Sequence, residues 1–334
     1  MKSKKAKKFP KKPVIGIDIG GTTVNSIIID TSGKIISQKQ FPTYGKKGPD
    51  YVVKNIAKNV KALVSESGLL MKNIWRAGVG SPGPLDSKKG IIMGAVNLPG
   101  WKYVRLKKGL EKYLKIKTAV DNDANCAAYG EQWTGAAKRA SDVVALTLGT
   151  GIGGGIILGG KLVRGANYNA AEIGHMSLDP RGRVCKCRAK GCFEQYASAS
   201  AIAKSAKNMI KNGAKSRITE LVNGKLNKID SKVVFDAYVS GDKTARAVWD
   251  EFIYYLGAGV ANIMNIFNPE MIVIGGGVIN AGDKLFRPLR RAARKQAFKA
   301  TYDAAKIVPA KLGQEAGAIG AAGLAIFEGD FYKL

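Results

Sequence analysis

Residues 14–30 read VIGIDIGGTTVNSIIID, and this stretch decides the fold. Its apolar and β-branched ends predict two strands, joined by the turn Gly20-Gly21-Thr22-Thr23. The two glycines can adopt positive φ angles, and the backbone N–H groups of such a turn can surround phosphate oxygens. Asp18 ends the first strand, where its carboxylate could hold Mg²⁺ directly or through a water molecule. Because most glycine turns only reverse the chain, this corner alone leaves both roles open.

The pattern of strand, glycine corner and strand returns in the second half of the chain. Residues 143–148 and 155–158 predict strands on either side of Gly149-Thr150-Gly151. A third corner, Gly275-Gly276-Gly277, follows a predicted strand at residues 271–274. Three corners at strand ends indicate a nucleotide site built from two diverged halves. The sequence has no Walker-type Gly-Lys-Ser/Thr, which excludes the P-loop class.

The remaining periodicity predicts an α/β protein. Helical spacing covers residues 50–67, 123–138, 197–211, 232–239, 244–267 and 315–328, and further strands are predicted near residues 75–80 and 116–120. In the closing helix Gly317, Gly320 and Gly323 leave one face without side chains, which permits close packing on a sheet or a nucleotide. The arrangement resembles the actin-like ATPase (ribonuclease H-like) fold, with two lobes, a duplicated βββαβαβα core and a cleft between them.

The charge of the chain is unusually positive. Lysine and arginine number 54 against 25 acids, for a formal net charge of +29. Residues 1–13 hold seven lysines and no acid, so most of the basic excess is spread over the rest of the chain. Such a field attracts ATP, polyphosphate or nucleic acid nonspecifically, and a solvated lysine-rich surface accounts for it without any partner. No run of about 18 apolar residues and no leader occur, so we expect a cytoplasmic protein without membrane contact.

Residues 121–125, with the sequence DNDAN, end a predicted strand and begin a predicted helix. A sugar hydroxyl is a poor nucleophile, and a carboxylate aligned on its proton assists phosphoryl transfer. The alternative is a helix N-cap, a position that suits Asp or Asn. One side chain can cap the helix, so the other acid and the amides need a different role.

The only histidine, His175, is followed at short spacing by Cys185, Cys187 and Cys192. Three thiolates and one imidazole so close in the chain predict a tetrahedral structural zinc site without an open position. The alternative is a packed histidine beside clustered cysteines by coincidence. Cys126 lies apart and is expected to be a small buried filler.

With these motifs in order, the sequence resembles the ROK family of sugar kinases and repressors over nearly its whole length. The match rests on DIGGTT at Asp18, GSPGPLD at Gly80, NLPGW at Asn97, DNDAN at Asp121, LGTGIGGG at Leu148, AEIGH ending at His175, CKCRAKGCFE at Cys185 and NPEMIVIGGG at Asn268. Three positions depart from the usual pattern. Arg188 replaces a glycine, which strains the chain if that residue needs positive φ, Asn25 replaces a frequent lysine and Phe193 a frequent leucine.

The resemblance implies site residues. Asp123 would be the general base, and the sugar pocket would be lined by Gly83, Asn97, Asn122, Asp123, Glu172, His175 and Glu194. The nucleotide would contact Asp18, Gly20, Gly21, Thr22, Thr23, Gly149, Thr150, Gly151, Gly275, Gly276 and Gly277. Zinc, held by His175, Cys185, Cys187 and Cys192, would fix the loops that carry Glu172 and Glu194.

Three parts of the chain are expected, the first from its lysine-rich composition and the other two from the resemblance. They are a disordered basic tail over residues 1–12, a small lobe of residues 13–122 with a returning segment at about 308–334, and a large lobe of residues 123–307. The large lobe would hold the zinc ligands and the dimerisation helices of a homodimer or homotetramer, a role that the apolar residues 249–267 fit as well as they fit a core.

The implied activity is transfer of the γ-phosphoryl group of ATP, with Mg²⁺, to a hexose, with glucose as the leading acceptor. N-acetylmannosamine, N-acetylglucosamine and fructose remain open, and polyphosphate is an alternative donor. A sugar-responsive repressor is a further alternative, although the short segment before the first predicted strand leaves no room for a helix-turn-helix domain.

Overall fold

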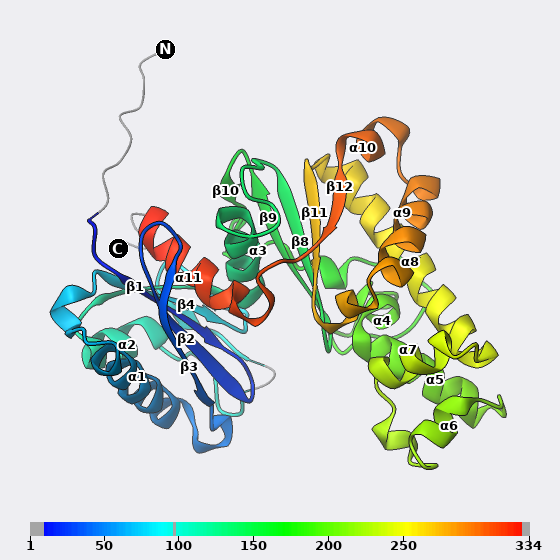
Figure 1. Cartoon of the computed structure of the whole chain (residues 1–334), viewed down its shortest axis with the longest axis horizontal. Helices are drawn as coiled ribbons and strands as arrows, with labels where there is room; N and C mark the ends of the chain where they lie inside the picture. The colour runs from blue at the N-terminus through cyan, green and yellow to red at the C-terminus, as the bar shows by residue number, and fades with distance from the viewer. Residues whose placement is uncertain (1–9, 96–97, 329–334) are drawn as a thin grey trace. The chain divides into compact units, whose positions relative to one another are not determined.

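The computed structural model describes residues 10–95 and 98–328, and the chain forms two compact units. Of the described residues, the first unit contains those from 10 to 139, 162–170 and 314–328, and the second contains residues 140–161 and 171–313. Each unit is built on one five-stranded mixed sheet covered by helices (Figure 1). The predicted basic tail lies largely outside the described residues.

The first sheet has the order β3-β2-β1-β4-β7. β1 pairs antiparallel with β2 and parallel with β4, and the register sets Asp18 opposite both Asn25 and Gly80. β4 is parallel to β7, so the carboxyl ends of β1, β4 and β7 lie at one edge. The bounds are β1 Val14–Ile19, β2 Thr23–Ile29, β3 Ile35–Pro42, β4 Arg76–Ser81 and β7 Lys117–Asn122, with a small hairpin of β5 Leu85–Asp86 and β6 Ile91–Ile92.

Four helices complete the first unit, namely α1 Pro49–Glu66, α2 Leu106–Leu114, α3 Asp123–Trp133 and α11 Ala316–Phe327. The apolar stripe of α1, with Val53, Ile56 and Val60, joins the core under the sheet. α11 packs closely on the other elements, because a Cβ at Gly320 would overlap the carbonyl of Cys126 on α3. The carbonyl of Ala318 likewise fills the space beside Gly16 of β1. The bare face predicted for the closing helix is thus used for close packing.

The second sheet repeats the first, with the order β10-β9-β8-β11-β12. β8 pairs antiparallel with β9 and parallel with β11, and β11 is parallel to β12. The bounds are β8 Val143–Leu148, β9 Ile152–Leu158, β10 Lys161–Leu162, β11 Met271–Gly275 and β12 Lys306–Pro309. The matching strand orders confirm the duplication predicted from the glycine corners.

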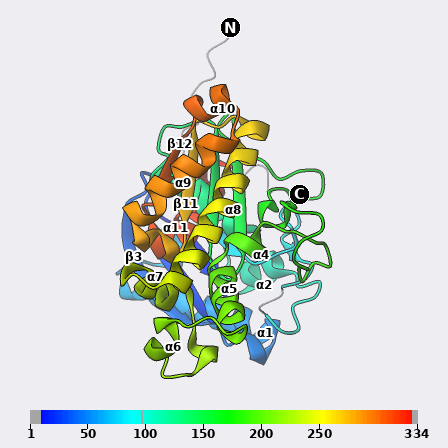
Figure 2. The same cartoon turned by 90° about the vertical axis from the view of Figure 1, so that its right-hand side faces the viewer.

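The helices of the second unit are α4 Glu194–Ala197, α5 Ala199–Lys211, α6 Arg217–Leu221, α7 Ser231–Val239, α8 Lys243–Phe267, α9 Asp283–Gln296 and α10 Lys299–Ala304. Figure 2 shows the long α8 beside α9, with α5, α6 and α7 gathered below them. Trp249, Phe252, Leu256 and Val260 of α8 are buried in this unit, so most of its apolar stretch is core.

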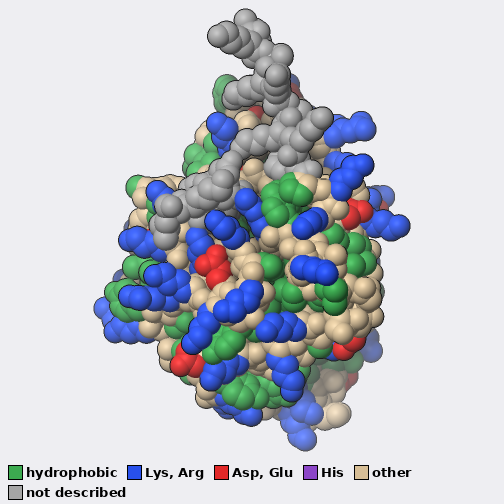
Figure 3. Space-filling view, turned by 90° about the vertical axis from the view of Figure 1, so that its left-hand side faces the viewer, with side chains coloured by type: hydrophobic (Ala, Val, Ile, Leu, Met, Phe, Trp, Pro, Cys, Tyr) green, Lys and Arg blue, Asp and Glu red, His purple; other side chains and the backbone are tan. Residues whose placement is uncertain are grey.

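Basic side chains are spread over the part of the surface that Figure 3 shows. On the face drawn in Figure 3, lysine and arginine side chains are scattered among other residues, with few acids between them. Within the described ranges, no helix combines the length and the apolar character needed to span a bilayer.

The division into units differs from the predicted lobes at three places. The return to the first unit is at Gln314, where about residue 308 was predicted. Helix α3 belongs to the first unit, which continues to Arg139 and does not end at residue 122. Residues 162–170 also belong to the first unit, although the chain on both sides of them belongs to the second.

Candidate functional site

The first glycine corner is a tight, hydrogen-bonded turn. The N–H of Gly20 donates to the carbonyl of Thr23 at 2.9 Å, and the hydroxyl of Thr43 donates to the carbonyl of Gly20 at 2.7 Å. Thr22 and Thr23 are exposed at the turn. The corner therefore has a fixed backbone and exposes the side chains of Thr22 and Thr23, whose hydroxyls can contact an anion.

Asp18 stands half-buried at the end of β1, with the backbone of Gly317 and Gly80 beside its carboxylate. A Cβ at Gly317 of α11 would lie 2.5 Å from its carboxylate, so only glycine fits there. Burial, followed by the nearby charge of Asp123, raises the pKa of Asp18 to about 7. A carboxylate held at such an energetic cost is a good candidate for neutralisation by a cation.

The DNDAN turn separates its three polar roles. Asn122 is the N-cap of α3, since its side chain accepts from the N–H groups of Ala124 and Asn125. Asp121 is 1% exposed and its carboxylate is hydrogen-bonded inside the unit. Asn122 thus fills the capping role, and the carboxylate of Asp123 is not needed for it.

Asp123 is the first residue of α3 and is half-buried. Burial is the main cause that raises the pKa of its carboxyl, opposed by the hydrogen bond from the N–H of Ala124. Cys126 lies one turn on, fully buried beside Gly80, where burial and the acids Asp121, Asp18 and Asp123 raise the pKa of its thiol. Cys126 is therefore the inert filler that was predicted. Two acids with raised pKa values share this end of the sheet, which is typical of a functional site.

The raised pKa of Asp18 predicts how stability depends on pH. Between pH 4 and 7 the folded chain keeps a proton that the unfolded chain releases, so stability falls as pH rises through this window and is flat above it. Asp18→Asn removes the buried ionisation. We expect it to raise Tm by roughly 2–5 °C at pH 8 and to change little at pH 4, measured by calorimetry. An equal shift at both pH values would contradict this account.

The other two corners lie together in the second unit. The N–H of Gly149 donates to the carbonyl of Gly151 at 3.0 Å, and its carbonyl accepts from the N–H of Ala199, the first residue of α5. Gly276 has φ 96°, and a Cβ there would overlap the carbonyl of Leu148 at the end of β8. The Gly275–Gly277 corner therefore packs on the strand that leads into the Gly149–Gly151 corner.

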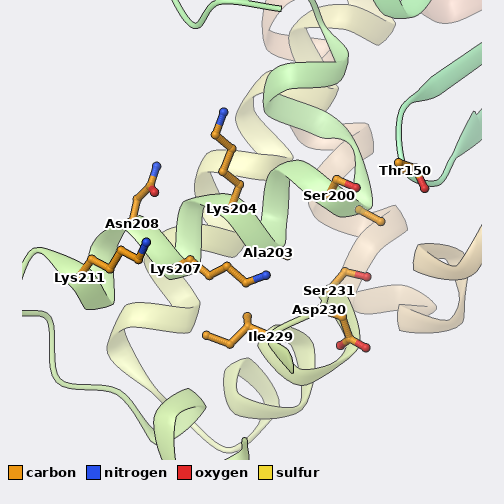
Figure 4. Close-up of a pocket in the computed structure, with 11 residues that line it drawn as sticks. Thr150, Ser200, Ala203, Lys204, Lys207, Asn208, Lys211, Ile229, Asp230 and Ser231 are labelled. Atoms are coloured by element: carbon orange, nitrogen blue, oxygen red, sulfur yellow. The ribbon is translucent and has the colours of Figure 1, made fainter. Parts of the chain in front are cut away.

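A pocket of about 530 Å³ opens beside Thr150 (Figure 4). α5 contributes three lysines to it, Lys204, Lys207 and Lys211, while Asp230 and Ser231 line it at the start of α7. Asp230 caps α7 by accepting from the N–H of Val233. In the described part of the chain none of the three lysines forms an ion pair, so the pocket carries positive charge next to the second glycine corner.

The histidine and the three cysteines converge. One ligand atom each from His175, Cys185, Cys187 and Cys192 lies within 4.8 Å of every other. The sulfurs of Cys187 and Cys192 are 3.6 Å apart, and Cys185 Sγ is 3.8 Å from His175 Nδ1. A tetrahedral zinc with bonds of about 2.0–2.3 Å separates its ligands by roughly 3.5–3.8 Å, so the four residues fit structural zinc. The N–H of Ala189 is the main cause that lowers the pKa of Cys187 to about 7, whereas burial raises the pKa of the Cys185 and Cys192 thiols. Three thiolates together therefore need a cation to neutralise them.

Two acids adjoin this cluster. Glu194 Oε1 lies 3.2 Å from Cys185 Sγ and 4.0 Å from His175 Nδ1, and Glu172 Oε2 lies 3.9 Å from His175 Nε2. A Cβ at Gly151 would overlap the carboxylate of Glu194. Glu194 therefore adjoins both the cysteine cluster and the second glycine corner.

Arg188 lies in the hairpin of the cluster with φ 76°, the left-handed region that the family's glycine at this position suggested. A side chain in this region costs about 1 kcal/mol relative to glycine. We therefore expect Arg188→Gly to stabilise the chain by about 1 kcal/mol and to raise Tm by about 2 °C in thermal unfolding. Arg181→Gly, at a neighbouring arginine without positive φ, is the control and should give no gain. An unchanged or lower Tm for Arg188→Gly would refute the strain.

The structure distributes the predicted site residues over the two units. Gly83 lies near Asn122, since a Cβ there would be 3.6 Å from its Nδ2. Asn97 lies outside the described residues. Phe193 is fully buried against Gly259 of α8, and Asn25 donates to the carbonyl of Gln314, so both departures from the family pattern are accommodated. Prediction missed the α5 lysines and Arg164, which the structure sets 2.7 Å from Asp121.

Comparison with known proteins gives a consistent result. The family model described as the ROK family matches residues 14–328. A glucokinase of Halalkalibacterium halodurans is 39% identical over 92% of this chain and 92% of its own. A xylose repressor of Caldicellulosiruptor bescii is 30% identical over 94% of this chain and 78% of its own. The crystal structure of a ROK family glucokinase from Streptomyces griseus with glucose and AMPPNP is 35% identical, covers 93% of this chain and 98% of its own, and gives a TM-score of 0.79. The fold is accordingly the actin-like ATPase fold, and the chain belongs to the ROK family.

Proposed function

We propose that this chain is a glucokinase, which transfers the γ-phosphoryl group of ATP to the 6-hydroxyl of glucose with Asp123 as general base. The observation that carries the proposal is that different side chains of the DNDAN turn cap the helix and supply a carboxylate. Asn122 caps the helix and leaves Asp123 as a half-buried carboxylate near Asp18. The similarity to two glucokinases supports glucose as acceptor and ATP as donor.

Asp123 acts on the proton of the acceptor. Its carboxylate takes the proton of the sugar hydroxyl as the oxygen forms its bond to the γ-phosphorus, the bond from that phosphorus to the bridging oxygen breaks, and ADP leaves. The raised pKa of Asp123 brings it closer to the operating pH, where a base accepts a proton most effectively. The proton then passes from the carboxyl group to solvent.

The donor is assigned to the glycine corners. Backbone N–H groups at Gly21 and Gly151 would bind phosphate oxygens, with the hydroxyls of Thr22, Thr23 and Thr150 beside them. Gly20 and Gly149 would shape the two corners, because their N–H groups donate within the turns. The corner from Gly275 to Gly277 would face the nucleoside. Asp18 would hold Mg²⁺, directly or through water. The ion would neutralise charge on the phosphates while the γ-phosphoryl group is transferred. The high pKa of Asp18 fits this role, because a cation removes the cost of its ionisation.

The acceptor is assigned to Gly83, Asn97, Asn122, Glu172, His175 and Glu194. Carboxylates of Glu172 and Glu194 would accept hydrogen bonds from sugar hydroxyls. Structural zinc at the His175 cluster would fix the loops that carry both acids, because these acids lie next to the metal ligands. Glu194 is also next to Gly151, so in the second unit the sugar acceptors adjoin a phosphate corner.

The test is ADP release, coupled to an optical readout, with ATP and Mg²⁺. Glucose, fructose, N-acetylglucosamine and N-acetylmannosamine are compared at equal concentration. Glucose should give the highest kcat/KM. If another sugar of the panel leads, the acceptor changes and the kinase mechanism stands. If none stimulates ADP release, the kinase proposal fails.

Polyphosphate is a second candidate donor, favoured by the α5 lysines. A linear chain of phosphates that starts at the Gly149–Gly151 corner could continue beside Thr150 along Lys204, Lys207 and Lys211. Replacing the three lysines by glutamine should raise KM for polyphosphate at least about tenfold. The control replaces Lys54, Lys58 and Lys61 on α1, which removes equal charge from another helix. Equal effects of the two triple variants would indicate nonspecific adhesion.

The proposals for cellular location, assembly and DNA binding rest on the similarity to related proteins. We infer a cytoplasmic enzyme that assembles as a homodimer or homotetramer, which sedimentation velocity would measure. The similarity to a xylose repressor keeps sugar-dependent DNA binding as the minor alternative. Sequence-specific shifts of promoter DNA at physiological salt would favour it.

A further inference from the structure

Arg164 is a buried cation in the first unit. Its residue is 8% exposed, its Nε lies 2.7 Å from Oδ2 of Asp121, and its Nη1 lies 2.7 Å from Oε2 of Glu328. It comes from residues 162–170, which join this unit although the chain on both sides belongs to the second. A buried guanidinium needs acidic partners that accept its N–H groups in a fixed geometry. Arg164 therefore also holds the side chains of Asp121 and Glu328 in position.

Asp121 passes this constraint to the catalytic turn. Its Oδ1 accepts from the N–H of Asn122 at 2.8 Å and from Nδ2 of Asn125 at 3.0 Å, while Oδ2 accepts from Arg164. Its side chain is 1% exposed. The two amide donors flank Asp123 in the sequence, so the carboxylate of Asp121 holds the chain on both sides of the proposed base.

Glu328 extends the constraint to the other acid. It is the C-cap residue of α11, the helix whose Gly317 lies against Asp18. α11 also packs on α3 through Gly320 and Cys126. Arg164 thus ties the end of β7 to the end of α11, and each of these elements supports one of the two acids with raised pKa values.

We propose that Arg164 is a positioning residue for phosphoryl transfer, which acts through Asp121 to hold the carboxylate of Asp123 in line with the acceptor hydroxyl. The inference rests on the proposed kinase function. Arg164 forms ion pairs with Asp121 and Glu328, so we expect its loss to change the alignment of the Asp123 carboxylate. Misalignment of a reacting group by about 1 Å can reduce turnover by about 10², without a matching loss of binding.

The test compares Arg164→Met with the wild type in the assay with ATP and glucose. We expect kcat to fall at least about tenfold while KM for glucose and for ATP stays within about threefold. Arg164→Lys should recover little, because an ammonium cannot reach both acids in the fork geometry of a guanidinium. Arg290→Met is the matched control, because this arginine of the second unit donates to the carbonyl of Ile307. It should lower Tm and leave kcat unchanged.

A double-mutant cycle shows whether Arg164 acts through Asp121. In an Asp121→Asn background, Arg164→Met should add less than about a twofold further loss of kcat. Full additivity of the two losses, or an unchanged kcat with only a lower Tm in Arg164→Met, would overturn the inference. Glu328→Gln, at the less buried partner, serves if Arg164→Met does not fold, and a wild-type kcat for it would count against the network.

A readout without turnover separates this inference from the proposed function. Wild-type ADP release alone decides the kinase activity. A crystal structure of Arg164→Met should have the backbone of residues 121–125 displaced, with the Asp123 carboxylate moved. An undisturbed turn would reject the positioning role even if the wild type phosphorylates glucose as proposed.

Discussion

Replacing Asp123 by asparagine should lower kcat by about 10² to 10⁴, the range for loss of a general base. The amide keeps the size of the side chain and can still accept from the N–H of Ala124. Asn122 continues to cap α3, so the fold should remain intact. KM for glucose should change little by comparison, because the lost interaction belongs to the transition state. Steady-state kinetics of ADP release measure both constants.

The pH profile provides an independent check on the same residue. In the wild type, kcat should fall as pH drops through the raised pKa of the Asp18 and Asp123 pair, because a protonated carboxyl cannot accept the sugar proton. In Asp123→Asn, the residual kcat should no longer show the part of the fall at low pH that is caused by protonation of Asp123. Asp30→Asn, just after the end of β2, is the control and should keep the wild-type profile. Near-normal turnover in folded Asp123→Asn would remove Asp123 from the mechanism.

The parts of the fold that the sequence predicts are those written in local patterns. The glycine corners stand at strand ends, and the repeated spacing of strand and corner predicts the two matching sheets. The helices at residues 50–67 and 244–267 begin and end within one residue of the prediction, because a regular apolar stripe runs through each. The helix predicted at residues 197–211 is α5, which begins at Ala199 because the side chain of Ser198 caps it by accepting from the N–H of Ala201, while Ala197 ends the separate α4. The helical spacing of apolar residues continues across Ser198, so the spacing alone does not reveal that a helix starts there.

What the sequence could not predict depends on distant partners. Residues 162–170 have no local signal that assigns them to the first unit. Arg164 pairs with Asp121 and Glu328, both far from it in the sequence. The DNDAN motif predicted a functional turn, yet which of its four polar side chains caps the helix and which is left for chemistry depends on the hydrogen bonds of Asn122 and Asp121. The grouping of His175 with Cys185, Cys187 and Cys192 was predictable because the three cysteines lie close together in the chain.

Replacing Cys187 by serine should release zinc and weaken sugar binding together. One of four ligands is lost, and the affinity of a structural site depends on all of them. We expect Tm to fall by roughly 10 °C, since metal binding is coupled to folding. KM for glucose should rise about 10- to 100-fold, because Glu172 and Glu194 both lie against the cluster. Elemental analysis, thermal unfolding and kinetics measure the three effects.

The cysteine outside the cluster supplies the control. Cys126→Ala should retain the zinc content of the wild type, since Cys126 lies under the DNDAN turn in the first unit. Unchanged zinc in Cys187→Ser would show that the four residues do not bind the metal as assigned. Loss of zinc with an unchanged KM would have another meaning: the cluster would hold its own hairpin, and the positions of Glu172 and Glu194 would be set by packing such as that of Glu194 against Gly151.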